Sequence, residues 1–184
     1  MSNIEKTIEV NVPVSTAYNQ WTQFEEFPQF MEGVKEVTQL DAKRLHWVAE
    51  IAGVEREWDA EIVDQVPDSQ ITWRATGGTR NDGVVTFRPA AADKTEIRLR
   101  LDIDPKGLLE NVADKLGFIS GRASGDLERF KEFIESRGAE TGAWRGEVKP
   151  GEAYPTDPSA SGSTSREKTG SERTRRTTHD TGSI

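Results

Sequence analysis

Three tryptophans fall at positions where strand alternation would bring them to one surface. Trp47, Trp58 and Trp73 each lie in a segment whose apolar residues alternate with polar ones. Because alternate side chains of a strand point to the same side, each indole is predicted on the apolar face of its strand. Ligand pockets are lined mainly by apolar and aromatic side chains, so three indoles interleaved with alanine could line a cavity. The alternative is ordinary core packing, in which aromatic side chains are also common.

Arg56 is the charged residue with the most unusual predicted position. By alternation it shares the face of Trp58, Ala60 and Ile62. A guanidinium that points into an apolar interior is costly unless it is paired. It could bind a carbonyl, phenolate or carboxylate group of a ligand. Two alternatives remain open: Arg56 lies at the solvent end of its strand, or it pairs with Asp64 on the same face.

Further ligand contacts are predicted on the segments that would surround this face. Phe30 and Met31 end an aromatic stretch that is interrupted by Pro28 and has the character of a lid or tight turn. Phe87 belongs to a later strand. The predicted ligand-binding set is completed by two residues of a long helix, Leu116 and Ser120.

The side chains needed for several other chemistries are missing. The chain has no Cys, which removes thiolate catalysis and Cys-based zinc sites. Its two histidines, His46 and His179, are not accompanied by a nucleophile or by metal-ligand spacing. Gly77-Gly78 lacks the Lys-Ser/Thr and the following helix of a phosphate-binding loop. We therefore predict no cofactor, no metal and no identifiable catalytic residue.

Strands and helices that would position these residues follow from periodicity. A period of two over 4–12, 34–40, 44–51, 54–66, 71–76, 82–88 and 95–104 predicts seven strands, and short connections favour antiparallel hairpins. A helix is predicted from Pro13 to Trp21, and a short second helix or turn over 24–31. Apolar residues recur at helical spacing from 105 to 136, which predicts one long helix ending at Gly138. Three glycines spaced by four in this helix, 117, 121 and 125, either let the helix approach the sheet closely, which is favoured, or leave room for a ligand.

The composition changes abruptly after residue 138. Residues 151–184 are rich in Gly, Ser, Thr, Pro and mixed charge, with Tyr154 as the only aromatic residue. Such a segment cannot bury enough apolar surface to offset its ordering entropy. The sequence therefore predicts one domain over 1–138 and a disordered tail over 139–184 that does not contribute to folding.

Charge and apolar runs restrict partners and location. Residues 139–184 hold seven acidic and seven basic residues, so the predicted domain carries the whole net charge of −8. An acidic domain repels phosphate backbones, so nucleic acid is not an expected partner. The N-terminus has no signal-peptide pattern and no apolar run is long enough to span a membrane. We therefore expect a cytoplasmic protein; the sequence indicates no particular oligomeric state.

The order of elements and several local motifs resemble a known superfamily. Pro13-Val-Ser-Thr-Ala-Tyr18 with Trp21, Phe24-Glu-Glu-Phe-Pro-Gln-Phe-Met31, Arg56-Glu-Trp-Asp-Ala-Glu-Ile62 and Asp126-Leu-Glu-Arg-Phe-Lys-Glu-Phe-Ile-Glu135 are similar to the START-like (SRPBCC) superfamily, in particular its polyketide cyclase/dehydrase and coenzyme Q-binding-protein branch. The resemblance implies an α+β helix-grip fold: a seven-stranded antiparallel sheet wrapped around a long C-terminal helix, with two short helices after the first strand. It also implies one cavity that accepts lipids, hormones, polyketides or quinones.

Three classes of function follow from these observations. The favoured hypothesis is binding of a hydrophobic small molecule, by a carrier or sensor, between the sheet and the long helix. A second is a cyclase/dehydrase-type enzyme in the same cavity, with Arg56 and Ser120 as its polar groups. A third is a protein-interaction module that uses the tail or the outer face of the sheet.

Overall fold

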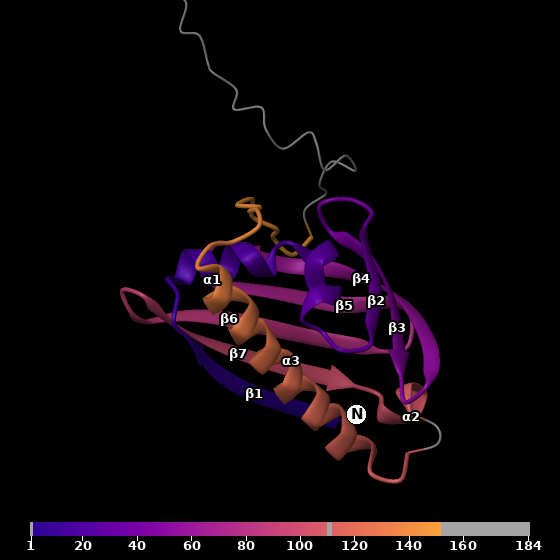
Figure 1. Ribbon diagram of the computed structural model, residues 1–184. Coiled ribbons are helices and arrows are strands. Elements are labelled where there is room, and N and C mark those ends of the chain that lie inside the picture. Colours follow the sequence, from indigo (N-terminus) through magenta and orange to yellow (C-terminus); the bar gives the residue numbers. More distant parts are fainter. Residues whose placement is uncertain (1, 110–111, 152–184) are drawn as a thin grey trace, which may run out of the picture.

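The computed structural model of the chain describes residues 2–109 and 112–151 (Figure 1). The elements run, in chain order, β1 (Ser2–Val10), α1 (Val14–Trp21), the 3₁₀ helix η1 (Phe24–Gln29), β2 (Val34–Gln39), β3 (Arg44–Ile51), β4 (Val54–Val66), β5 (Gln70–Gly78), β6 (Asn81–Ala91), β7 (Lys94–Ile103), α2 (Pro105–Leu108) and α3 (Lys115–Arg137). All seven predicted strands and both predicted short helices are present.

The strands form one antiparallel sheet that curls around α3 (Figure 1). Its order is β1-β7-β6-β5-β4-β3-β2, so neighbours in the chain pair as hairpins and β1 closes onto β7. Alternation explains why one face is buried: along β7, Ile97 and Leu99 are buried whereas Arg98 and Arg100 are exposed. The predicted α+β helix-grip fold, with a seven-stranded sheet wrapped around the C-terminal helix, is confirmed.

The two short helices cover one end of the concave face. Pro13 precedes α1 and fixes the backbone for helix entry, and Ala17, Tyr18 and Trp21 are buried against the sheet. The tighter η1 accommodates Pro28 and buries Phe24 and Phe27. Gly33 then turns the chain into β2. Its φ of +84° is a backbone conformation that favours glycine.

The long helix predicted over 105–136 is divided, which corrects the sequence interpretation. Asp104 caps α2 by accepting a hydrogen bond from the Lys106 N–H, and Asp114 caps α3 in the same way from the Gly117 N–H. Between them the chain leaves the helical path at Leu109, whose side chain is 1% exposed in the core. Two capping aspartates and the burial of Leu109 outweigh the apolar periodicity that suggested a continuous helix. The predicted end is correct, since Gly138 adopts a left-handed conformation and donates to the Ile134 carbonyl.

The three glycines of α3 do not bring the helix closer to the sheet, contrary to the sequence interpretation. A side chain at Gly121 would meet open space, and one at Gly117 would collide with the capping carboxylate of Asp114. The nearest group to Gly125 is the Arg129 side chain of the same helix. The face that packs on the sheet carries Ala123, Leu127, Phe130 and Ile134 instead.

Residues 139–149, which we call the C-terminal strap, pack on the fold although they were expected to belong to the disordered tail. Val148 is completely buried and forms an antiparallel bridge with Gln65, with N···O distances of 2.9 and 3.0 Å. The Arg145 guanidinium makes a two-pronged ion pair with Asp68 at 2.6 and 2.8 Å. The boundary predicted at 138 therefore falls inside the packed structure. The rest of the predicted tail, 152–184, lies outside the described residues.

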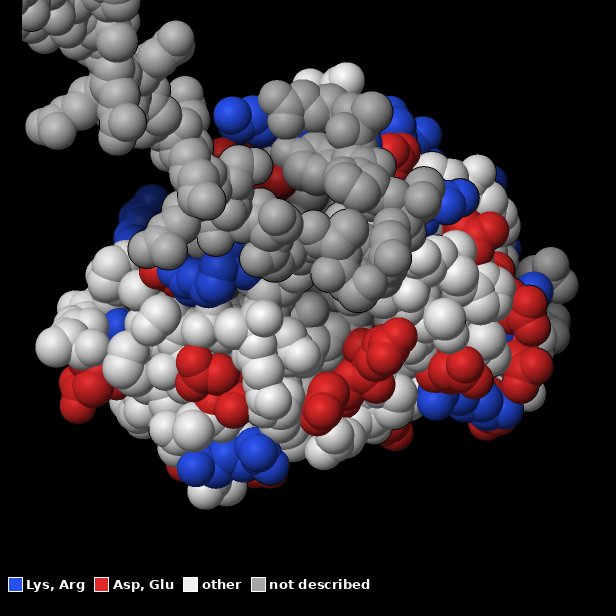
Figure 2. Space-filling view, turned by 90° about the horizontal axis from the view of Figure 1, so that it is seen from above, with Lys and Arg blue, Asp and Glu red and all other residues white. Residues whose placement is uncertain are grey.

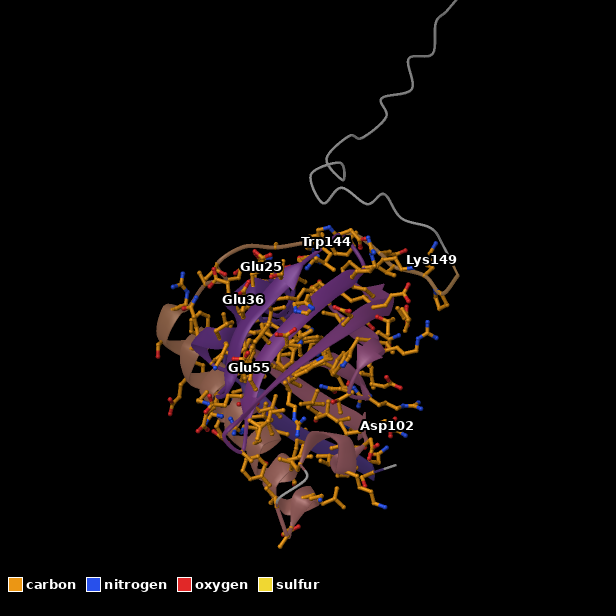
Figure 3. The ribbon with its side chains drawn as sticks, turned by 90° about the vertical axis from the view of Figure 1, so that its right-hand side faces the viewer. Glu25, Glu36, Glu55, Asp102, Trp144 and Lys149 are labelled. Atoms are coloured by element: carbon orange, nitrogen blue, oxygen red, sulfur yellow. The ribbon has the colours of Figure 1, made fainter. Side chains whose placement is uncertain are left out.

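Polar side chains of α1 explain why the strap binds there. Gln20, which is 0% exposed, accepts from the Thr141 N–H at 2.9 Å, and buried Asn19 donates to Glu140 at 2.9 Å. The Trp144 N–H donates to the Thr22 hydroxyl at 3.0 Å. Figure 3 shows Trp144 and Lys149 at one end of the molecule, well away from Asp102 of β7. The strap thus satisfies buried polar groups that would otherwise lack partners.

Candidate ligand cavity

The inner face of the sheet is not completely filled. A cavity of about 180 Å³ lies between the sheet and the N-terminal half of α3, bounded on one side by α1 and η1. Its apolar walls come from four strands and the helix: Leu45, Trp47, Ala49 and Ile51 of β3, Trp58, Ala60 and Ile62 of β4, Ile71 and Trp73 of β5, Leu99, Leu101 and Ile103 of β7, and Phe118, Ile119, Ala123 and Leu127 of α3.

The three predicted tryptophans all line this cavity. Trp47 and Trp58 are directly opposite each other on β3 and β4, and their rings stack with centroids 5.8 Å apart and planes 9° apart. Trp73 lies opposite Gly83 of β6, and a side chain at Gly83 would collide with the Trp73 ring. Gly83 therefore lets the third indole lie flat against the sheet.

The remaining predicted contacts divide into two groups. Met31 lines the cavity. Phe30 and Phe87 are instead buried in the packed core. The ring centroids of Phe30 and Phe130 are 5.2 Å apart, and those of Phe87 and Tyr18 are 5.4 Å apart. Neither is among the residues that line the cavity.

Leu116 and Ser120 do not face the cavity, which corrects their assignment as ligand contacts. Leu116 is 43% exposed, and both residues border a shallow surface hollow beside Asn3 and Glu5. The reason is helical phase, since Ser120 is rotated by about 100° from Ile119, which faces the cavity.

Arg56 lies on the inner face of β4, opposite Ala49, as alternation predicted. It is not among the cavity-lining residues. Its Nε is buried and has no hydrogen-bond partner among the described residues. Asp64, the alternative partner, accepts a hydrogen bond from Gln70 instead.

One edge of the cavity is polar and joins α3 to the loop between η1 and β2. Arg122 donates to the Glu32 carbonyl at 2.5 Å, and the Glu32 N–H donates to Asp126 at 3.0 Å. Gly33 makes this possible, because a side chain there would collide with the Arg122 guanidinium. The exposed Glu32 and Glu50 also line the cavity, which places its mouth here. Sequence reasoning missed this group; its signal was Arg122 and Asp126, four residues apart beside the apolar stripe of α3.

Asp126 is a cavity-lining residue whose carboxyl group has a shifted pKa. Burial raises the pKa of its carboxyl group, although hydrogen bonds from Arg129 and the Glu32 N–H oppose the shift. The same carboxyl group lies 2.5 Å from the Arg129 guanidinium, so the cavity edge carries an ion pair.

The lining contains one further polar side chain, Asn81 of β6. Its Oδ1 is buried and has no hydrogen-bond partner among the described residues. Sequence analysis assigned it no role; the signal was an amide in phase with Gly83 and Val85, on the buried side of its strand.

The cavity offers shape and a few polar contacts rather than a catalytic constellation. None of its described lining residues is Ser, Thr, Tyr, Lys or His. His46 lies on the outer face, 2.7 Å from Asp59. Within residues 2–109 and 112–151, no three His, Asp or Glu side chains are grouped to hold a metal ion. The helices of this described part include none long and apolar enough to cross a membrane.

Charges on the described surface are mixed. The end of the molecule seen in Figure 2 carries acidic and basic side chains interspersed with neutral ones. Among the described residues in this view, basic side chains do not form the continuous stripe that a nucleic-acid backbone requires.

Known proteins share both the sequence pattern and the fold. The family described as polyketide cyclase/dehydrase and lipid transport matches residues 10–132. An uncharacterised 17.2 kDa protein of Streptomyces lincolnensis is 53% identical over 149 residues, which cover 80% of this chain and 99% of that protein. Because this match is longer than 138 residues, it extends beyond α3 into the region of the strap.

Solved structures share the fold of this chain. A Deinococcus radiodurans protein is 27% identical, with a TM-score of 0.60 over 75% of this chain and 99% of its own. The ZhuI aromatase/cyclase of Streptomyces sp. R1128 superposes with a TM-score of 0.65 over 78% of this chain and 99% of its own, at 14% identity. A START superfamily protein of Mycobacterium smegmatis superposes with a TM-score of 0.59, at 20% identity, over 73% of this chain and 95% of its own. The match over residues 10–132 shows that the chain belongs to the polyketide cyclase/dehydrase and lipid transport family.

Proposed function

We propose that this protein binds a compact hydrophobic small molecule, aromatic or alicyclic, in the cavity between the sheet and α3. The observation that carries the proposal is the cavity lined by three indoles. The apolar walls of this space are not covered by other protein atoms, so a bound apolar ligand would make the contacts that they lack.

The cavity volume restricts the class of ligand. Drug-sized ligands occupy pockets of about 300–1,000 Å³, whereas an apolar cavity of about 150 Å³ accepts benzene. A cavity of about 180 Å³ therefore suits one or two rings. A lipid chain or a folded polyketide would have to extend through the mouth at Glu32 and Glu50.

An enzyme of the cyclase/dehydrase type is the second candidate, and Asp126 is the observation that favours it. Its partly buried carboxyl group lines the cavity beside the Arg129 guanidinium and could exchange a proton with a ligand carbonyl there. The Arg122 guanidinium, which also lines the cavity, could stabilise the negative charge left on Asp126. Conversion of a bound polyketide that is lost in Asp126→Asn would support this candidate; saturable binding without conversion supports the carrier.

Quenching of tryptophan fluorescence by 1,4-naphthoquinone tests the binding proposal. The chain has no Cys, so no thiol can capture the quinone covalently. We expect saturable quenching with one site per chain. Ala60→Phe, which fills the cavity, should abolish the saturable component, whereas Ala91→Phe at an exposed site should retain it. Equal quenching in both folded variants would show that the quinone does not enter the cavity.

A further inference from the structure

Asn81 is the one polar side chain on the inner face of β6. Along this strand Asn81, Gly83, Val85 and Phe87 alternate toward the interior, and the last three are buried. Asp82, between them, points outward, where its carboxylate accepts from the Ala75 N–H at 2.9 Å. The strand geometry therefore aims the Asn81 amide at the cavity, which it lines.

The Asn81 side-chain oxygen is a buried hydrogen-bond acceptor without a donor among the described residues. A buried acceptor without a partner costs about 1–3 kcal/mol. Among the described residues two buried side-chain atoms lack a partner, Arg56 Nε and Asn81 Oδ1, and only Asn81 belongs to the cavity lining. Asn81 lies opposite Ile103, and the lining around it is apolar, including Trp73 and Leu101. The described walls near it thus supply no donor to this oxygen.

We propose that the ligand of this cavity carries a hydroxyl or N–H group that donates a hydrogen bond to Asn81 Oδ1. The inference rests on the binding function proposed above and narrows its ligand class. A hydrocarbon can pack against the indole walls but leaves the amide oxygen without a hydrogen bond. A compact phenol or an aromatic amine can pack against the indoles and also donate a hydrogen bond to this oxygen. Selectivity follows, because a site built around a polar partner disfavours the ligand that lacks it.

The pair p-cresol and p-xylene isolates this interaction, because a hydroxyl replaces a methyl group of similar size. Both are single rings that suit a cavity of about 180 Å³. Binding can be followed by ¹H–¹⁵N NMR of the indole N–H groups, which is independent of ligand absorbance. The quantity of interest is the ratio of the two dissociation constants, measured on the full chain.

Asn81→Leu removes the acceptor and keeps the number and branching of the side-chain heavy atoms, and Asn81→Asp keeps an oxygen acceptor. We expect the preference for p-cresol over p-xylene to fall by roughly tenfold in Asn81→Leu, the scale of one hydrogen bond in a desolvated site, while p-xylene binding is retained. Asn81→Asp should keep the preference. Retained p-xylene binding also shows that the Leu variant is folded.

Three outcomes would overturn the proposal in distinguishable ways. If wild-type protein binds neither ring, the proposed binding function itself fails. If both rings bind and the ratio is unchanged in Asn81→Leu, the function stands but Asn81 does not select the ligand. If 4-methylbenzaldehyde, which only accepts hydrogen bonds, binds more tightly than p-cresol, the amide nitrogen faces the ligand and the donor assignment is wrong.

Discussion

The two ends of the concave face are built from the same residue types and have opposite character. At the closed end, under α1 and the C-terminal half of α3, aromatic rings meet edge to face: the ring centroids of Tyr18 and Phe87 are 5.4 Å apart, and those of Phe30 and Phe130 are 5.2 Å apart. At the hollow end, Trp47 and Trp58 stack against each other and border the cavity with Trp73.

Small residues account for the difference. At the hollow end the indoles stand beside Ala49 and Ala60, whose small side chains leave the space in front of the sheet unfilled. At the closed end Tyr18, Phe87 and Phe130 project into the same layer and fill it. Packing volume, rather than hydrophobicity, therefore separates the core from the candidate site.

The largest expected effect comes from truncating one phenylalanine at each end of the same helix. Phe130→Ala at the closed end should lower the free energy of unfolding by about 3–5 kcal/mol, because Phe130 is 0% exposed and its site cannot collapse. Phe118→Ala should cost about 1 kcal/mol, since that ring is only partly buried beside an existing cavity. Urea denaturation measures both. Equal losses would show that the ends are packed alike.

Removal of the strap should affect the closed end alone. Truncation after Gly138 loses the burial of Val148, worth about 1.5–3 kcal/mol, and the bonds to α1. We expect the melting temperature to fall by roughly ten degrees, at about 2–4 °C per kcal/mol. Truncation after Gly151 is the matched control and should change it by no more than a degree or two. A stable protein ending at Gly138 would contradict the packed strap.

Enlarging an alanine should separate the ends by the space available. Ala17→Leu at the closed end, where Ala17 is 0% exposed, should cost about 1–3 kcal/mol through overpacking. Ala49→Leu at the cavity wall should change stability by less than about 1 kcal/mol, because the added atoms enter empty space. Thermal melts in the absence of ligand provide the comparison. A greater loss in Ala49→Leu would mean that the cavity is already filled by its own walls.

The smallest expected effect concerns two acidic residues of α3, whose contributions to the free energy of unfolding should change with pH in opposite directions. Burial raises the pKa of Asp126 above its ordinary 3.8, so its contribution to stability is fully present below 3.8 and is lost as pH rises through the folded pKa. Asp126→Asn should therefore gain stability relative to wild type as pH rises from 3.5 to 7.

Glu135 provides the control. Burial pushes its pKa up, but hydrogen bonds from Lys131 and the Asn11 N–H outweigh burial and lower it below 4.5. Its contribution is therefore present above 4.5 and lost as pH falls, so Glu135→Gln should lose stability relative to wild type as pH rises. Melting temperatures across the same range measure both differences. The same sign in the two variants would contradict the assigned shifts.

Sequence periodicity was sufficient for the fold and insufficient for the site. Alternation placed every strand and brought Trp47, Trp58 and Trp73 to one face, because strand geometry is local. It did not show the break at Leu109, where burial in a distant core overrides helical spacing. It also missed the strap, although Trp144 and Val148 are large apolar residues beyond the predicted boundary.

The direction in which a side chain points within the folded protein was the hardest feature to predict from the sequence. Leu116 and Ser120 share the helix with Ile119 but not its orientation. Asn81 became significant only when its strand partners and the empty space in front of it were both known. The cavity is bounded by residues from many strands and helices, and no single segment of the sequence predicts it.

The hollow end of the concave face contains an apolar space that the closed end lacks. A crystal structure under xenon pressure tests it, because xenon enters dry apolar cavities. We predict a xenon atom bounded by Trp58, Trp73 and Leu101, and none among Tyr18, Phe87 and Phe130. Absence of xenon from the hollow end, or its presence at the closed end, would contradict the division on which the proposed function rests.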